Sequence, residues 1–155
     1  MEPTPDELAG IVDLFGAVTD GELRRSCEEL AARTGGDTGT DDRVGDAIDD
    51  ALTGFELVEY AVDGQTGYVV GPTAFPEPPT HAEDLPHILD VPRRSIDRDV
   101  AGTNARERFE AGVDAAIDGN DGDRARTLID VSYDIEAWAP VELEVYRDDL
   151  ETVIE

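Results

Sequence analysis

Apolar residues in the first third of the chain recur at helical spacing and predict three helices. Pro5 and Asp6 open the first helix, and Gly16 ends it. Residues 19–22, Thr-Asp-Gly-Glu, have the form of a capping box, so a second helix is expected to begin there. A third is expected after the glycine-rich loop 35–40. The three apolar faces are Leu8, Ile11, Val12 and Phe15; Leu23, Cys27, Leu30 and Ala31; and Val44, Ile48, Ala51 and Leu52.

Strand-like composition follows the third helix. Residues 55–62 and 66–70 are rich in aromatic and β-branched side chains, with Asp63-Gly64 between them, which predicts a β-hairpin. The next segment contains four prolines, a composition unsuited to a helix or a central strand. We therefore expect a domain boundary near residues 72–82. These prolines are Pro72, Pro76, Pro78 and Pro79.

The C-terminal half is predicted to be helical. A short helical turn is expected within 84–90, a helix with Pro92 at its first position, two amphipathic helices separated by 119–122, and a last helix restarted by Pro140. The expected fold class is mainly α with a small β-hairpin (α+β). Its parts are residues 1–75, a proline-rich connector at 76–92, and a helical region at 93–155.

The charge of the chain is strongly one-sided. It has 38 acidic and 12 basic residues, a net charge of −26, and every basic residue is an arginine. Such a surface repels itself in dilute buffer, whereas molar salt shortens the Debye length to about 3 Å. The composition therefore indicates a protein of a salt-in halophile.

Composition also narrows the location. With Cys27 as the only cysteine, no intrachain disulfide can form. No apolar run approaches the length of a membrane span, and the acidic N-terminus lacks a signal-peptide pattern. We expect a cytoplasmic protein with no membrane partner, and the sequence leaves its oligomeric state open.

The order helix, helix, helix, hairpin over about residues 5–75 resembles a winged helix-turn-helix domain, with Tyr68-Val69-Val70 as the return strand of the wing. The whole chain is also similar to a haloarchaeal protein family of unknown function. The winged-helix resemblance implies a regulatory fold. The similarity to the haloarchaeal family implies where the protein comes from but no activity. The phrases that carry them are Leu8-x-x-Ile11-Val12-x-Leu14-Phe15, Val44-x-x-x-Ile48-x-x-x-Leu52-x-x-Phe55, and Phe75-Pro76 with residues 83–91.

Two features depart from the winged-helix pattern. Residues 34–40 make a longer connection than the usual turn of 3–4 residues between the second and third helices. Residues 41–53 carry five aspartates against Arg43, where readers of DNA present basic or amide side chains. An acidic third helix opposes contact with phosphates, so DNA is a disfavoured partner.

One segment of the chain is basic. Residues 93–108 hold five arginines and three acids, and guanidinium groups suit phosphates and carboxylates. They are candidates for binding a partner or a phosphate, although internal pairing with the many carboxylates is the more frequent outcome. The candidates are Arg93, Arg94, Arg98, Arg106 and Arg108.

Other motifs fall short of a site. His81 and His87 flank acids, but neither matches a zinc pattern. Residues 35–40 lack the Gly-Lys-Ser/Thr ending of a phosphate loop, and a calcium loop begun at Asp118 places Ile129 where glutamate belongs. Cys27 is expected to be a buried apolar residue. We therefore expect no metal, no cofactor and no catalytic residue.

The sequence supports a non-enzymatic regulatory or protein-interaction module whose partner is an unknown protein. A DNA-binding transcription regulator is the alternative, with the arginines offsetting the charge of the third helix. A small-molecule sensor is a third hypothesis, and no residue requires it.

The charge pattern predicts a salt-dependent fold. Lowering KCl from molar to dilute concentration should weaken or abolish folding, because the Debye length rises from about 3 Å to about 10 Å at 0.1 M and exposes the carboxylates to one another. Circular dichroism during KCl dilution measures this. An equally stable, cooperative fold in dilute KCl would refute the halophilic interpretation.

Overall fold

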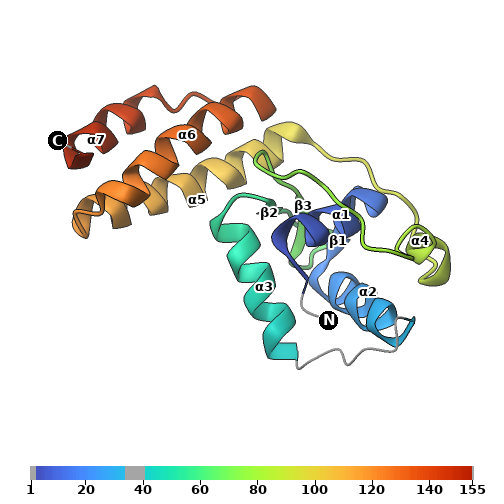
Figure 1. The fold of residues 1–155 in the computed structure, drawn as a ribbon. Helices are drawn as coiled ribbons and strands as arrows, with labels where there is room; N and C mark the ends of the chain where they lie inside the picture. Colours follow the sequence, from blue (N-terminus) through green and yellow to red (C-terminus); the bar gives the residue numbers. More distant parts are fainter. Residues whose placement is uncertain (1–2, 34–40, 155) are drawn as a thin grey trace. The chain divides into compact units, whose positions relative to one another are not determined.

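The structure is a computed structural model that describes residues 3–33 and 41–154 (Figure 1). The described residues form seven helices and three strands. The predicted mainly helical α+β class is confirmed. The elements are α1 (Pro5–Phe15), β1 (Ala17–Thr19), α2 (Asp20–Arg33), α3 (Asp41–Thr53), β2 (Leu57–Glu59), β3 (Gly67–Val70), α4 (Leu85–Ile88), α5 (Arg98–Asp118), α6 (Gly122–Trp138) and α7 (Glu144–Ile154).

The chain divides into two units, Met1–Ile96 and Asp97–Glu155. We expected a boundary in the proline-rich segment, whereas the first unit continues to Ile96 because that segment packs on it. We call residues 71–96 the strap. Three of its side chains, Ala82, Leu85 and Val91, are buried in the core formed by α1–α3 and the sheet.

The sheet of the first unit is antiparallel, with strand order β1-β3-β2. Val18 pairs with Tyr68, and Val58 pairs with Val69. The expected two-stranded hairpin is therefore completed by β1, a strand that the sequence did not predict. Three residues between two helices are too short to display the period-2 pattern of a strand.

The hairpin turns more tightly than we expected. Val62 and Gln65 exchange backbone hydrogen bonds of 2.9 Å, which leaves only Asp63 and Gly64 in the turn. Both have positive φ, 51° and 78°, as a type I′ turn requires. The predicted four-residue connection is therefore a two-residue turn, because one further pair of residues joins the two strands next to it.

The predicted capping box at the start of α2 is present. Glu22 N–H donates to Thr19 Oγ1 at 3.1 Å, and Thr19 N–H donates to Glu22 Oε1 at 2.9 Å. These bonds satisfy two backbone donors that the helix itself leaves unpaired. The glycine-rich loop 35–40 lies outside the described residues.

The helix predicted to begin at Pro92 is absent. Residues 91–97 have no regular structure, and α5 begins at Arg98 after the N-cap Asp97, whose side chain accepts a hydrogen bond from Asp99 N–H. The physical reason lies in the first unit: Arg94 N–H donates 2.8 Å to Phe15 O at the end of α1. This bond, with the side-chain contacts of Arg93 to α1 and of Arg94 to α2, holds these residues against the first unit in a non-helical conformation.

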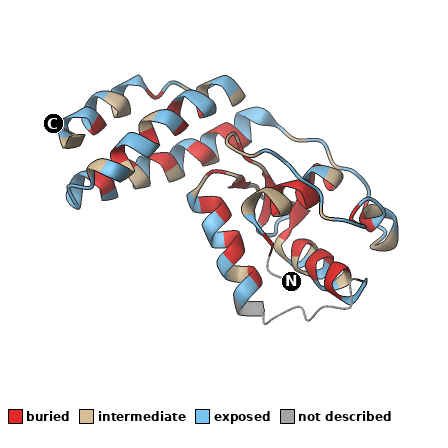
Figure 2. Cartoon of the chain, viewed as in Figure 1, coloured by how far each residue is buried: buried red, intermediate tan, exposed pale blue. Residues whose placement is uncertain are grey.

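The second unit is built from α5, α6 and α7. Each helix buries one face and exposes the other (Figure 2). The rings of Phe109 and Tyr146 meet edge to face at 5.8 Å, joining α5 to α7. The predicted restart at Pro140 is too early, because residues 139–143 are not helical and Leu143 N–H donates 2.8 Å to Glu136 instead. The buried side chains include Ala105, Phe109, Val113, Ala116, Ala125, Leu128, Ile135, Leu143 and Leu150.

The contact of the strap with α1 makes a testable prediction at Gly10. A Cβ there would overlap the backbone of Glu77 and Pro78, so Gly10→Ala must push the strap away from α1. We expect a loss of about 1–3 kcal/mol in the free energy of unfolding, as for other overpacked sites. Denaturant unfolding in molar KCl measures it.

Gly21→Ala is the matched control, since Gly21 is also helical but a Cβ added there would have no described neighbour within 4 Å. It should stabilise the chain by up to about 1 kcal/mol through helix propensity. Equal stability of the two variants would show that the strap does not pack closely on α1.

Candidate functional site

The five candidate arginines do not form one surface in the structure. Arg93 and Arg94 belong to the first unit, whereas Arg98, Arg106 and Arg108 lie on α5 in the second. Most of them contact groups of their own unit. Their individual contacts decide which of them is left for a partner.

Arg93 and Arg94 bind the C-terminal end of α1. Arg93 Nη1 donates to Asp13 O at 2.7 Å, and the backbone N–H of Arg94 donates to Phe15 O. The last carbonyls of a helix have no partner within the helix, and α1 has no basic residue in its last turn. The strap supplies these donors from about 80 residues along the chain.

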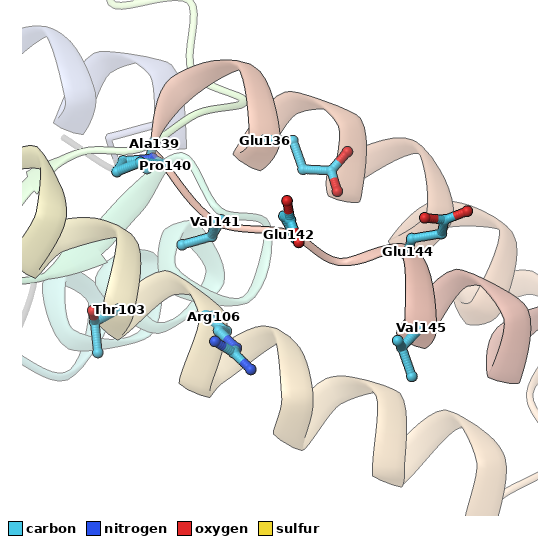
Figure 3. Close-up of a pocket in the computed structure, with 9 residues that line it drawn as sticks. All are labelled: Thr103, Arg106, Glu136, Ala139, Pro140, Val141, Glu142, Glu144 and Val145. Atoms are coloured by element: carbon cyan, nitrogen blue, oxygen red, sulfur yellow. The ribbon is translucent and has the colours of Figure 1, made fainter.

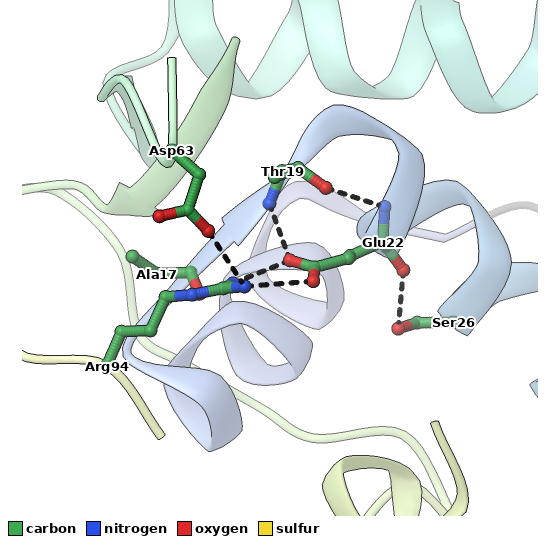
Figure 4. A network of polar contacts seen from close by, with 6 residues as sticks. All are labelled: Ala17, Thr19, Glu22, Ser26, Asp63 and Arg94. Atoms are coloured by element: carbon green, nitrogen blue, oxygen red, sulfur yellow. Dashed lines mark hydrogen bonds and ion pairs between the residues drawn. The ribbon is translucent and has the colours of Figure 1, made fainter. Parts of the chain in front are cut away.

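Arg94 also forms an ion pair with Glu22 (Figure 4). Its Nη1 and Nη2 lie 2.6 and 3.0 Å from the two carboxylate oxygens, and Nη1 also donates to Ala17 O at 3.0 Å. The hydrogen bond from Arg94 lowers the pKa of Glu22, an effect that burial opposes. This ionised carboxylate therefore serves both the capping box of α2 and the guanidinium of the strap.

Arg98 is held within the second unit. Its Nη1 donates 3.0 Å to Trp138 O, and its guanidinium carbon lies 4.8 Å from the centre of the Trp138 ring, a cation–π contact. Arg108 is half-buried on α5. Arg106 is exposed and makes no ion pair with any residue that the structure describes.

Arg106 borders an open hollow of about 830 Å³ in the second unit (Figure 3). One wall is α5, with Thr103 and Arg106, and the other is formed by the end of α6, the connection 139–143 and the start of α7. The opposite wall combines apolar and acidic side chains. Its residues are Glu136, Ala139, Pro140, Val141, Glu142, Glu144 and Val145.

An internal ion pair of the second unit escaped the sequence analysis. Arg147 Nη1 donates to Glu136 at 2.9 Å and to Ser132 Oγ at 3.0 Å, while its guanidinium lies 4.3 Å from the Tyr133 ring centre. Burial acts to raise the pKa of Glu136, but the hydrogen bonds from Leu143 N–H and from Arg147 together lower it. Ser132 and Glu136 are four residues apart, so the sequence places them on one face of a helix, where one side chain can contact both. No sequence pattern identified Arg147, on the next helix, as that side chain.

Two exposed surfaces lie on the first unit. On α3, the side chains of Asp46, Asp49 and Asp50 face solvent. On the strap, Phe75 is 81% exposed although its backbone is held by hydrogen bonds. Phe75 N–H donates to Asp6 Oδ1 at 3.1 Å, and Ala74 N–H donates to Gly71 O. The aspartates of α3 were evident from the sequence, whereas no sequence pattern gave Phe75 a role.

Glu56 carries a buried carboxylate oxygen, Oε1, without a hydrogen-bond partner in the described structure. Burial raises the pKa of this group, and the nearby Asp6 and Asp50 raise it further. It follows Phe55, which has a φ of 64° at the end of α3. Its Oε1 lies beside Gly54, where an added Cβ would overlap it.

Metal and thiol chemistry find no support in the described residues. Within 3–33 and 41–154, no three His, Cys, Asp or Glu side chains lie close enough to hold an ion. Cys27 is buried, and burial raises the pKa of its thiol to about 12. None of the helices described has the length and apolar character that crossing a membrane requires.

The Arg94–Glu22 contact predicts a pH-dependent loss of stability. Because the folded pKa of Glu22 is lowered, its stabilising effect is present above the ordinary pKa of glutamate and is lost as pH falls through the lowered value. Arg94→Gln should reduce the free energy of unfolding by about 2 kcal/mol at neutral pH, and the difference should shrink on acidification. Denaturant unfolding at several pH values measures it.

Arg126→Gln is the control, because the Arg126–Asp123 pair is exposed, at 59% and 98%. Its removal should change stability by less than about 1 kcal/mol. A difference between Arg94→Gln and the parent chain that stays constant down to acidic pH would contradict the role of Glu22.

Comparisons with known proteins identify a family without an assigned activity. No curated protein and no solved structure gives a significant match. One family model matches residues 6–155, which is nearly the whole chain. The match includes both units, so the strap and the three C-terminal helices belong to the same family pattern as the N-terminal elements. The chain is therefore a member of the family of unknown function DUF7109.

Proposed function

We propose that this chain is a non-enzymatic regulatory protein of a salt-adapted cytoplasm, in which a winged-helix-like unit binds another protein. The element order α1-β1-α2-α3-β2-β3 and the sheet order β1-β3-β2 support the resemblance drawn from the sequence. In such a domain α3 corresponds to the recognition helix, and the hairpin of β2 and β3 corresponds to the wing.

The observation that carries the proposal is the acidic exposed face of α3. Asp46, Asp49 and Asp50 face solvent, with Arg43 as the one exposed basic side chain among the described residues of this helix. Asp63, at the tip of the wing, is also exposed. Such a surface repels phosphates, which favour basic protein surfaces, and it complements a partner rich in arginine or lysine.

Phe75 supports the same proposal from the strap. A large aromatic side chain that is exposed on an ordered backbone loses little conformational entropy when it enters a pocket. Such residues contribute most of the affinity at many protein interfaces. The partner that fits this unit therefore has a basic surface and an apolar pocket.

A DNA-binding regulator is the alternative, favoured by the element order alone. Arg93, Arg94 and Arg98 contact groups of their own units, which leaves fewer of the candidate arginines for binding DNA. No catalytic residue is assigned, because the sequence offers no nucleophile–base pair.

The proposal predicts that α3 captures a protein rather than DNA. A tagged chain should retain specific proteins from a halophilic lysate in molar KCl, with or without a salt-tolerant nuclease. Replacing Asp46, Asp49 and Asp50 by Asn should reduce this retention about tenfold, because the complementary charges are lost. Quantitative mass spectrometry of the captured proteins measures it.

Replacing Asp114, Asp118 and Asp130 by Asn is the matched control, since these exposed residues of the second unit give the same change in charge. Equal capture by the two triple variants would reject α3 as the contact surface. Recovery of defined DNA fragments that nuclease removes would support the transcription-regulator alternative instead.

A further inference from the structure

The hollow of the second unit carries charges of both signs that do not pair with each other. Arg106 projects from α5, whereas Glu142 lies in the connection from α6 to α7 and Glu144 begins α7 (Figure 3). Arg106 forms no ion pair with either glutamate or with another described residue. A ligand with both an anionic and a cationic group would satisfy both sides.

The third glutamate of the hollow is already neutralised. Glu136 accepts hydrogen bonds from Arg147 and from Leu143 N–H. Together, Arg106 and Arg147 face three carboxylates in and beside the hollow, so its net charge is −1, from two arginines and three glutamates. The charges available to a ligand are therefore one guanidinium and an excess of carboxylate.

Apart from Thr103, the rest of the lining is apolar. Pro140, Val141 and Val145 lie between the charged groups, and Val145 is 70% exposed to solvent. An aliphatic chain placed across them would remove this apolar surface from water, which stabilises a complex. The hollow therefore matches a flexible ligand with an aliphatic stem between charged ends.

We propose that this hollow binds a free amino acid with a basic side chain, such as lysine or arginine. Its α-carboxylate pairs with Arg106, its aliphatic stem covers Val141 and Val145, and its cationic groups face Glu142 and Glu144. A free phosphate or another simple anion would meet the two glutamates, and a metal ion would meet Arg106. The net charge of +1 on such an amino acid complements the net charge of the hollow.

The proposal is independent of partner binding by α3, since no residue of the first unit enters it. It gives the second unit a ligand-sensing role beside the interaction role proposed for the first. A ligand that binds the folded state stabilises it in proportion to its occupancy. Binding here would also hold the start of α7 to α5.

The test is a titration of the full chain in molar KCl, followed by two-dimensional NMR of its backbone amides. L-Lysine and L-arginine should give saturable shifts confined to residues 103–106 and 139–145. Norleucine, which has the aliphatic stem without the side-chain ammonium, and lysine amide, which lacks the carboxylate, should each bind about tenfold more weakly, the cost of one lost charged hydrogen bond.

Arg106→Gln and Glu142→Gln should each weaken lysine binding about tenfold. Both side chains are exposed, so the variants should keep the parent spectrum outside the hollow. Arg126→Gln is the control, since Arg126 carries the same charge but pairs with Asp123 outside the hollow. Its affinity should equal that of the parent chain.

Three results would overturn the proposal. The first is the absence of saturable shifts with either basic amino acid, and the second is unchanged affinity in Arg106→Gln. The third is binding of Nα-acetyl-lysine at least as tight as that of lysine, which would assign the hollow to the C-terminal residue of a peptide. The aspartate variants of α3 should bind lysine normally, so failure of this test and failure of partner capture are separable.

Discussion

The ion pair between Arg94 and Glu22 is the interaction on which the first unit depends. Glu22 closes the capping box of α2, while Arg94 reaches the carbonyl of Ala17 in β1 and, through its backbone, the end of α1. Three elements therefore meet at these two residues. Loss of either side chain would leave the other charged group and one backbone group, Ala17 O or Thr19 N–H, without this partner in a half-buried environment. That is more costly than the loss of one surface contact.

Two arginines of this acidic chain form ion pairs that are shielded from solvent. Arg94 and Arg147 are largely buried, at 23% and 15% exposure, and each binds a glutamate together with a second polar group. Salt screens such shielded pairs less than it screens surface charges. Molar salt would thus relieve repulsion among the exposed carboxylates and leave the internal pairs largely intact, so the two contributions to stability act on different parts of the molecule.

The sequence predicted what depends on neighbouring residues. The capping box at Thr19, the end of α1 at Gly16 and the turn at Asp63 follow from residues within four positions of one another. The periodic apolar faces predicted most helices for the same reason. Three features could not be found this way: β1, the packing of the strap, and the destinations of the arginines. Each depends on residues far apart in the chain, such as Arg93 and Asp13, about which periodicity carries no information.

The long reach of the strap has a consequence for the order of folding. The contacts of its Arg93 and Arg94 with α1, β1 and α2 join residues 72 to 80 positions apart, so a large loop must close before they form. In the second unit, α5, α6 and α7 follow one another and pack as neighbours. Local contacts form faster than distant ones. A chain emerging from the ribosome therefore cannot complete its first unit until residue 96 is available, and the unit made last has the shorter path to its native contacts.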